Sequence, residues 1–358
     1  MVNNEHRLKK LRPLLQQHNI DAVIITNPIN LRYLSGFDGT SAVLLIGASD
    51  AGLITDFRYT EQAAAQAGGF TIYRREEDLY KTIADIIKKK GWGRLAFEAK
   101  HVTFAEHREM AEKLPAELIP INESAESLRL IKSAAELELI GKGAAITADA
   151  FDYICSAVKP GLSEKELGLG LEMYLRRRGA EEKSFRYIVA SGVRGAMPHG
   201  TASAKIMERG ELVTIDYGAV FEGYATDMTR TVALGEPGKK RREIYAVVQE
   251  AQHAAAEALR PGIAAREVDG IARRIIEEHG YGDYFGHGLG HGVGLETHEL
   301  PVLNKQSDTV LKPGMVVTVE PGIYIGGFGG VRIEDMLAVT ENGADVLTEA
   351  ARDLVVIQ

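Results

Sequence analysis

The chain has 358 residues, enough for two domains with well-buried cores, and its 45% hydrophobic and 26% charged residues are typical of a globular protein. Its net charge of −8 argues against nucleic acid as a partner, and no apolar run approaches the roughly 20 residues of a membrane-spanning helix. The polar amino terminus lacks the core of a secretory signal and the single cysteine, Cys155, excludes an internal disulfide, so we expect a cytoplasmic protein without a membrane partner.

The first third of the sequence, from His6 to about Ile121, alternates short apolar runs such as DAVIIT and SAVLLIG with amphipathic stretches such as DLYKTIADIIKKKG. This alternation predicts an α/β domain with a largely covered sheet, which we place at residues 1–124. The polar stretch from Asn122 to Ser127 is typical of a linker. Ser133 and Glu136 then form a potential capping box ahead of a long predicted helix, in a second domain at residues 125–358.

The second domain contains a pattern that occurs twice, about one hundred residues apart. Lys159-Pro160-Gly161 and Arg260-Pro261-Gly262 each precede an amphipathic helix that ends at glycine, Gly179 or Gly280. A run rich in valine, isoleucine and threonine follows in each case and ends on a carboxylate. Two unrelated units with similar turns are the simpler alternative, but the matching order favours an internal duplication with a pseudo-two-fold relation.

The first copy places two aspartates on strand-like runs separated by a turn. In VTIDYGAVFEGYATDMTRTV, Glu222-Gly223 lies midway between Asp216 and Asp227 and is typical of a hairpin turn. We therefore expect both aspartates on neighbouring strands. Alone, an aspartate at a strand end is more often solvated or part of a turn.

A histidine-rich stretch, HGLGHGVGLETHE, comes next and contains His287, His291 and His298. The first two have the i, i+4 spacing that zinc peptidases use on a helix. The surrounding glycines each cost a helix about 1 kcal/mol relative to alanine. We therefore expect a non-helical frame in which the three histidines have different roles.

The second copy supplies another pair of carboxylates, Glu320 and Glu334, in VTVEPGIYIGGFGGVRIEDML. If the two copies pack together, four carboxylates converge, and their mutual repulsion would force one or more to take up a proton. Two divalent ions would relieve this repulsion and could clamp the transition state of a hydrolysis. Carboxylates with one imidazole favour Mn²⁺, with Co²⁺ and Zn²⁺ as alternatives.

These motifs together resemble the M24-type metallopeptidases with the pita-bread fold, and most closely the Xaa-Pro peptidases, aminopeptidase P and prolidase. The stretches VTIDYGAVFEGYATDMTRT, HGLGHGVGLETHE, VVTVEPGIYI and VRIEDM occur in that family's order. In the first domain, ITNPINLRYLSGFDGTSAVLLI and LITDFRY resemble the amino-terminal, creatinase-like domain of the same family. The resemblance implies an α/β domain followed by a pita-bread catalytic domain, hydrolysis of the bond before proline in a peptide substrate, and a homodimer.

The resemblance also assigns five metal ligands, all of which this sequence retains. Asp227 and Glu334 would bridge both ions, Asp216 would bind one ion, and His291 with Glu320 would bind the other. Glu320 would also act as general base and pass its proton to the leaving nitrogen.

Five further residues match positions near the substrate in that family: His199, His287, His298, Tyr324 and Arg332. His298 would hold the scissile carbonyl or stabilise the developing oxyanion, and His199 would assist proton transfer. For two of these residues a purely structural role remains open. His287 could merely cap a turn, and Arg332 could be a structural partner of the carboxylates.

Three other functions are compatible with parts of the pattern. Methionine aminopeptidase shares the fold and ligands, but the amino-terminal domain, His287 and the arginine of RIED disfavour it. A creatinase-type hydrolase or a non-catalytic binding protein on the same scaffold would have lost metal ligands. The sequence does not separate a dipeptidase from an aminopeptidase that acts on longer peptides.

Overall fold

The computed structural model describes residues 4–76, 78–122 and 125–358, which fall into two compact units, 1–129 and 130–358. The predicted linker from Asn122 to Ser127 includes residues 123 and 124, which lie outside the described part of the chain. Among the described helices, none combines the length and apolar character that a membrane span requires.

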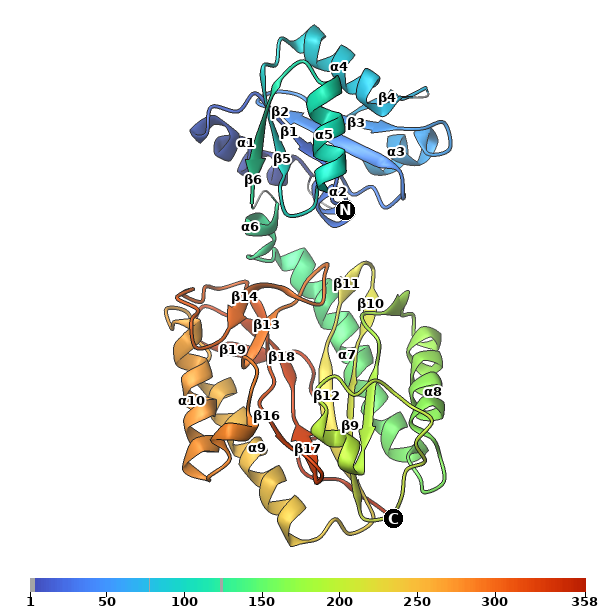
Figure 1. The fold of residues 1–358 in the computed structure, drawn as a ribbon, viewed down its shortest axis with the longest axis vertical. Helices are drawn as coiled ribbons and strands as arrows, with labels where there is room; N and C mark the ends of the chain where they lie inside the picture. The colour runs from blue at the N-terminus through green and yellow to red at the C-terminus, as the bar shows by residue number, and fades with distance from the viewer. Residues whose placement is uncertain (1–3, 77, 123–124) are drawn as a thin grey trace. The chain divides into compact units, whose positions relative to one another are not determined.

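Unit 1 is built around a six-stranded sheet with the order β4-β3-β2-β1-β5-β6 (Figure 1). Its strands are β1 (Ala22–Ile25), β2 (Ala42–Gly47), β3 (Ala51–Thr55), β4 (Thr71–Arg74), β5 (Arg94–Glu98) and β6 (Glu117–Ile121). Strand β2 is antiparallel to β1 and β3, whereas β4, β5 and β6 pair in parallel. Strands β1 and β3 are buried along their whole length, as expected for a sheet covered on both faces.

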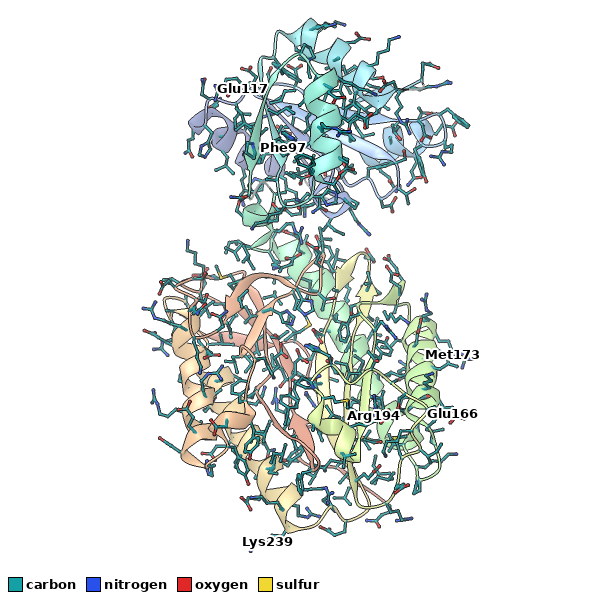
Figure 2. All side chains as sticks on the ribbon, viewed as in Figure 1. Phe97, Glu117, Glu166, Met173, Arg194 and Lys239 are labelled. Carbon is teal, nitrogen blue, oxygen red and sulfur yellow. The ribbon has the colours of Figure 1, made fainter. Side chains whose placement is uncertain are left out.

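Helices cover this sheet. They are α1 (Asn4–Gln17), α2 (Pro28–Ser35), α3 (Thr60–Gln66), α4 (Leu79–Lys90) and α5 (Phe104–Lys113), with the short α6 (Glu126–Arg129) at the end of the unit. Phe97 of β5, a core residue that is labelled in Figure 2, packs against His107 of α5, with ring centres 5.0 Å apart. The predicted α/β domain is therefore confirmed.

The first half of unit 2 consists of two helices packed on one set of strands. It contains α7 (Ala134–Ala157), α8 (Glu164–Arg177), β7 (Glu182–Lys183), β8 (Ile188–Ser191), the 3-10 turn η1 (Gly192–Ala196), β9 (Glu211–Tyr217), β10 (Ala219–Phe221), β11 (Tyr224–Ala225) and β12 (Met228–Leu234). The predicted capping box is present at the start of α7, where Ser133 and Glu136 bond to each other's backbone amides. Leucines and valines of α8, β9 and β12 form a core of their own.

The second half repeats this plan with its own core. It contains α9 (Lys239–Ala258), α10 (Ala265–Glu278), the 3-10 turn η2 (Gly282–Tyr284), β13 (Gly290–Gly292), β14 (Glu299–Leu303), β15 (Val316–Val319), β16 (Gly322–Ile325), β17 (Gly329–Arg332), β18 (Asp335–Val339), β19 (Ala344–Val346) and β20 (Val356–Ile357). In Figure 1, α8 lies at one edge of the unit, α9 and α10 lie at the other, and the strands run between them.

Backbone contacts recur at matching turns of the two halves. Gly161 donates to Met207 in the first half, and Gly262 donates to Leu311 in the second. The left-handed φ angles of these two glycines are 88° and 89°, so both turns require glycine. The isolated bridge between Ser163 and Ile206 likewise has a counterpart between Ala264 and Val310. The duplication inferred from the sequence is thus present in the backbone.

Candidate metal centre

The first pair of carboxylates lies at the same end of two paired strands. Asp216 is near the end of β9 and faces Thr229 of the antiparallel β12, while Asp227 immediately precedes β12. The predicted turn between them is a two-residue hairpin, in which Glu222 and Gly223 have φ angles of 46° and 82°. Positive φ at both positions is the signature of a type I′ turn, which suits the twist of the adjoining strands.

The second pair occupies the corresponding places in the other half. Glu320 directly follows β15 and Glu334 directly precedes β18, which is antiparallel to β15. The hairpin of β16 and β17 connects them, as the two-residue turn does in the first half. Each half therefore presents one carboxylate from the end of its first strand and one from the start of its second.

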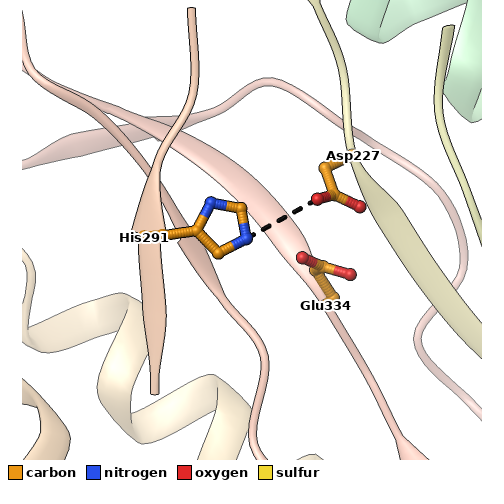
Figure 3. A group of neighbouring side chains, drawn as sticks. All are labelled: Asp227, His291 and Glu334. Carbon is orange, nitrogen blue, oxygen red and sulfur yellow. Dashed lines mark ion pairs between the residues drawn. The ribbon is translucent and has the colours of Figure 1, made fainter. Parts of the chain in front are cut away.

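Three of the predicted ligands approach one another closely. Asp227, His291 and Glu334 each offer a ligand atom within 4.8 Å of the other two (Figure 3). Nε2 of His291 lies 3.7 Å from Oδ2 of Asp227 and 3.3 Å from Oε1 of Glu320. The stretch that carries His291 is the short strand β13, so the i, i+4 histidines are not on a helix, as expected.

The ring of His291 is oriented for binding a cation through one nitrogen. Its Nδ1 lies 3.0 Å from the carbonyl oxygen of Gly292, and a carbonyl can only accept a hydrogen bond. Nδ1 must therefore carry a proton, which leaves Nε2 facing the carboxylates. Although burial opposes it, the hydrogen bond and charge of Glu320 raise the pKa of His291 in the metal-free protein, and loss of the Nε2 proton would free a lone pair for a cation. A backbone partner of this kind commonly fixes the tautomer of a metal-ligating histidine.

Burial and mutual repulsion dominate the electrostatics of the cluster. Burial, followed by the charges of Glu334 and Asp216, raises the pKa of Asp227 well above its usual range, and burial with Glu320 and Asp216 does the same for the pKa of Glu334. Burial alone would also raise the pKa of Glu320. The hydrogen bond to His291 and the positive charge of His291 instead lower the pKa of Glu320 to about 2. Bringing these carboxylates together without a cation therefore costs free energy.

Two buried carboxylate oxygens indicate what would offset this cost. Oδ1 of Asp216 and Oδ1 of Asp227 are inaccessible to water and have no hydrogen-bond donor among the described residues. Buried polar atoms are nearly always paired, and carboxylate oxygens with an imidazole nitrogen are a donor set that divalent cations accept. The residues present thus fit a cation that interacts with both halves of the unit.

Arg332, Tyr324 and His287 form a hydrogen-bonded chain that begins at the cluster. Arg332 donates to Oδ2 of Asp216 at 2.6 Å and to the hydroxyl of Tyr324 at 2.9 Å, and this hydroxyl lies 3.0 Å from Nε2 of His287. Nδ1 of His287 is 2.7 Å from the carbonyl of Gly288 and so carries the proton. Burial lowers the pKa of His287, so its neutral Nε2 accepts from Tyr324.

His199 and His298, the other two histidines predicted to lie near the substrate or the metal, are more exposed than His287 and His291. His298 packs its ring against that of His291, with centres 4.3 Å apart, and burial together with the charge of His291 lowers its pKa. It lines an open groove of about 470 Å³ with Phe185, Leu295 and Thr297. His199 is exposed, and its charge contributes to the lowered pKa of His298. Both side chains are thus accessible to a substrate next to the cluster.

Two threonines that support the cluster were missed by the sequence analysis. Thr229 donates to Oε2 of Glu334 at 2.6 Å and accepts from Arg332, and Thr318 donates to Oε1 of Glu320 at 3.2 Å and accepts from the amide of His291. Thr229 follows Asp227 by two residues and Thr318 precedes Glu320 by two. A polar residue two positions from a strand carboxylate shares its face, and this spacing could have identified both.

Both units match models of known protein families. Residues 138–341 match the model of metallopeptidase family M24, and residues 7–131 match the creatinase/prolidase N-terminal domain. A solved Xaa-Pro dipeptidase from Bacillus anthracis is 45% identical, with a TM-score of 0.98, and the match covers 99% of this chain and 100% of that one. The Xaa-Pro dipeptidase of Pyrococcus furiosus is 40% identical over 98% of this chain and 99% of its own length. An X-Pro aminopeptidase structure from Thermotoga maritima is 36% identical, with a TM-score of 0.90, over 95% of this chain and 98% of that chain.

Proposed function

The chain belongs to metallopeptidase family M24, with a creatinase/prolidase N-terminal domain, and we propose that it hydrolyses the peptide bond before proline with two divalent metal ions. The observation that carries this proposal is the pair of buried oxygens on Asp216 and Asp227 that lack hydrogen-bond donors beside His291. The names of the relatives, which are Xaa-Pro dipeptidases and an X-Pro aminopeptidase, support the substrate class.

Asp216, Asp227, His291, Glu320 and Glu334 would hold the ions, with Mn²⁺ preferred because most donors are carboxylate oxygens. When bound, such ions polarise the scissile carbonyl and make water a better nucleophile at neutral pH. Glu320, whose carboxylate lies beside His291, would take a proton from the attacking water and deliver it to the departing proline nitrogen.

The accessible histidines would act on the substrate itself. Because its pKa is lowered, His298 is neutral at physiological pH and can donate a hydrogen bond to the scissile carbonyl oxygen. His199 would assist proton transfer. A bond before proline is a tertiary amide without an N–H, so recognition has to rest on the carbonyl and the ring.

The test combines metal reconstitution with a substrate series. Chelator-treated protein is assayed with Mn²⁺, Co²⁺ or Zn²⁺ on Ala-Pro, Ala-Pro-Ala and longer peptides, with Ala-Ala as control, and bound metal is counted by elemental analysis. We expect two ions per chain and cleavage only before proline. Removal of methionine from Met-Ala peptides, with Xaa-Pro peptides left intact, would instead identify a methionine aminopeptidase.

The length series also decides between the two kinds of Xaa-Pro peptidase. Two of the relatives named above are dipeptidases, so we propose Xaa-Pro dipeptides as the preferred substrates. Faster cleavage of tripeptides and longer peptides would assign the chain to the aminopeptidases instead. Homodimer formation remains a prediction from the resemblance, and a cytoplasmic location remains a prediction from the amino-terminal sequence and the single cysteine.

A further inference from the structure

A buried ion pair on helix α10 lies outside the candidate metal centre. Asp269 and Arg273 are one helical turn apart, and their side chains are 1% and 9% exposed. Nε and Nη2 of Arg273 donate to the two carboxylate oxygens of Asp269 at 3.0 and 2.8 Å, so the guanidinium is held in a fixed plane. Burying an ion pair usually adds little stability, which raises the question of what this one does.

The remaining hydrogen bonds of the pair all reach one loop. Arg273 donates through Nη1 to the carbonyl of Phe285 at 2.9 Å and through Nη2 to that of His287 at 2.9 Å. Oδ1 of Asp269 accepts from the amide of Leu289 at 3.1 Å. The guanidinium also lies over the ring of Phe285, 4.2 Å from its centre. Three alternate residues of this loop are therefore bound to two adjacent side chains of a rigid helix.

This loop carries one end of the hydrogen-bonded chain described above. Nε2 of His287 accepts from Tyr324, whose hydroxyl accepts from Arg332, and Arg332 in turn holds Asp216. The glycines on both sides of His287 give its backbone little stiffness of its own. The position of the imidazole must therefore be set from outside the loop.

We propose that Asp269 and Arg273 are positioning residues for the peptidase reaction, acting through His287 on Tyr324 and Arg332. This inference rests on the proposed function for its kinetic test. The planar fork of an arginine is needed because one group must reach Asp269, Phe285 and His287 together, whereas the ammonium of lysine is a point charge that cannot match this geometry.

The primary variant is Arg273→Lys, and the matched control is Arg176→Lys. Arg176 forms an i, i+4 pair with Glu172 on the corresponding helix α8 and donates to the carbonyl of Glu181 in the segment that follows this helix. Unlike Arg273, it is exposed, and none of the candidate site residues lies in the segment that it contacts. We expect Arg273→Lys to lower kcat/KM for Ala-Pro about tenfold with bound metal unchanged, and Arg176→Lys to retain the wild-type value.

A double-mutant cycle separates positioning from general stability. If Arg273 acts through His287, then Arg273→Lys should lower kcat/KM less than twofold further in a His287→Ala background. Equal losses in both backgrounds, or a wild-type value for Arg273→Lys alone, would overturn the proposal. If Arg273→Lys does not fold, the doubly neutral Asp269→Asn/Arg273→Gln variant takes its place in the cycle, since it leaves no unpaired buried charge.

A readout that does not depend on activity is hydrogen exchange of the loop amides. We expect the Leu289 amide, which Asp269 holds, to exchange at least tenfold faster in Asp269→Asn/Arg273→Gln than in the wild type. Unchanged exchange would contradict the proposal. A wild-type protein that fails to cleave Ala-Pro would refute the proposed function alone, because the exchange measurement still tests the contact between α10 and the loop.

Discussion

The buried carboxylates are held in an unfavourable state unless a cation joins them, and Asp227 shows this most clearly. Its carboxylate is surrounded by Glu334, Asp216 and Glu320, which together with burial raise its pKa. We predict that Asp227→Asn abolishes metal-dependent peptidase activity, by at least about 100-fold, because one of the proposed metal ligands is lost. The same change should make the chelator-treated protein more stable, by about 1.4 kcal/mol for each unit of the relieved pKa shift.

Urea unfolding of chelator-treated wild type and Asp227→Asn measures this difference, and circular dichroism controls for an unchanged fold. With Mn²⁺ the order should reverse, because only the wild type gains stability from metal. A less stable Asp227→Asn protein in chelator would show that this carboxylate is not under repulsion.

The raised pKa values also fix a pH dependence for the metal-free protein. A carboxyl whose pKa is higher in the folded than in the unfolded state is protonated more readily when folded, so its contribution to stability falls as the pH rises above about 4. We therefore predict that the stability advantage of Asp227→Asn over the wild type widens between pH 5 and pH 8. Denaturation at several pH values tests this prediction, and a gap that narrows with pH contradicts it.

Among the secondary-structure elements, the hairpin of β16 and β17 places Arg332 by direct backbone contact with the η1 segment. A Cβ added at Gly330 would lie 2.2 Å from the carbonyl oxygen of Gly195. Arg332 also donates to the carbonyl of Pro198, which follows η1. We predict that Gly330→Ala pushes the hairpin away, destabilises the protein by about 1–3 kcal/mol and weakens peptide cleavage.

Gly326 on the same hairpin is the matched control, because a Cβ there meets nothing within 4 Å. Thermal unfolding and Ala-Pro cleavage of both variants give the comparison. Equal behaviour of Gly330→Ala and Gly326→Ala would show that the contact between η1 and β17 does not set the position of Arg332.

Features that depend on neighbouring residues can be predicted from this sequence, whereas contacts between residues far apart in the chain cannot. The type I′ turn at Glu222 and Gly223, the capping box at Ser133 and the non-helical setting of His291 follow from local chemistry and are found in the structure. The ion pair on α10 was missed because its partners are backbone groups of a loop further along the chain. An aspartate and an arginine four residues apart on a helix look the same whether they are solvated or buried.

At the scale of the whole molecule, duplication explains why the site can be built at all. Each half supplies one hairpin with two carboxylates, and the two hairpins also contact each other directly, because Thr229 donates to Glu334 and Arg230 donates to Asp335. Arg332 of the second half donates to Asp216 of the first, but Oδ1 of Asp216 and Oδ1 of Asp227 still have no hydrogen-bond donor among the described residues. The proposed cation, contacted by both hairpins, would neutralise this charge and add to the cohesion between the halves.

The proposed cation should stabilise the strands that carry its ligands more than the rest of the chain. All five candidate ligands lie in unit 2, on or beside β9, β12, β13, β15 and β18. We expect saturating Mn²⁺ to slow hydrogen exchange in these strands, with a gain of about 2.7 kcal/mol at a free metal concentration of 100 times Kd. Strands β1 and β2 of unit 1, which carry none of the candidate ligands, should change less.

Exchange mass spectrometry of chelator-treated and Mn²⁺-loaded protein measures this pattern, and Asp227→Asn serves as the control that should not respond. Slowed exchange confined to one half of unit 2 would mean that the cation contacts only one hairpin. Slowing of both β12 and β18 is the result expected if Asp227 and Glu334 share the metal, because these two residues directly precede the two strands and belong to different halves.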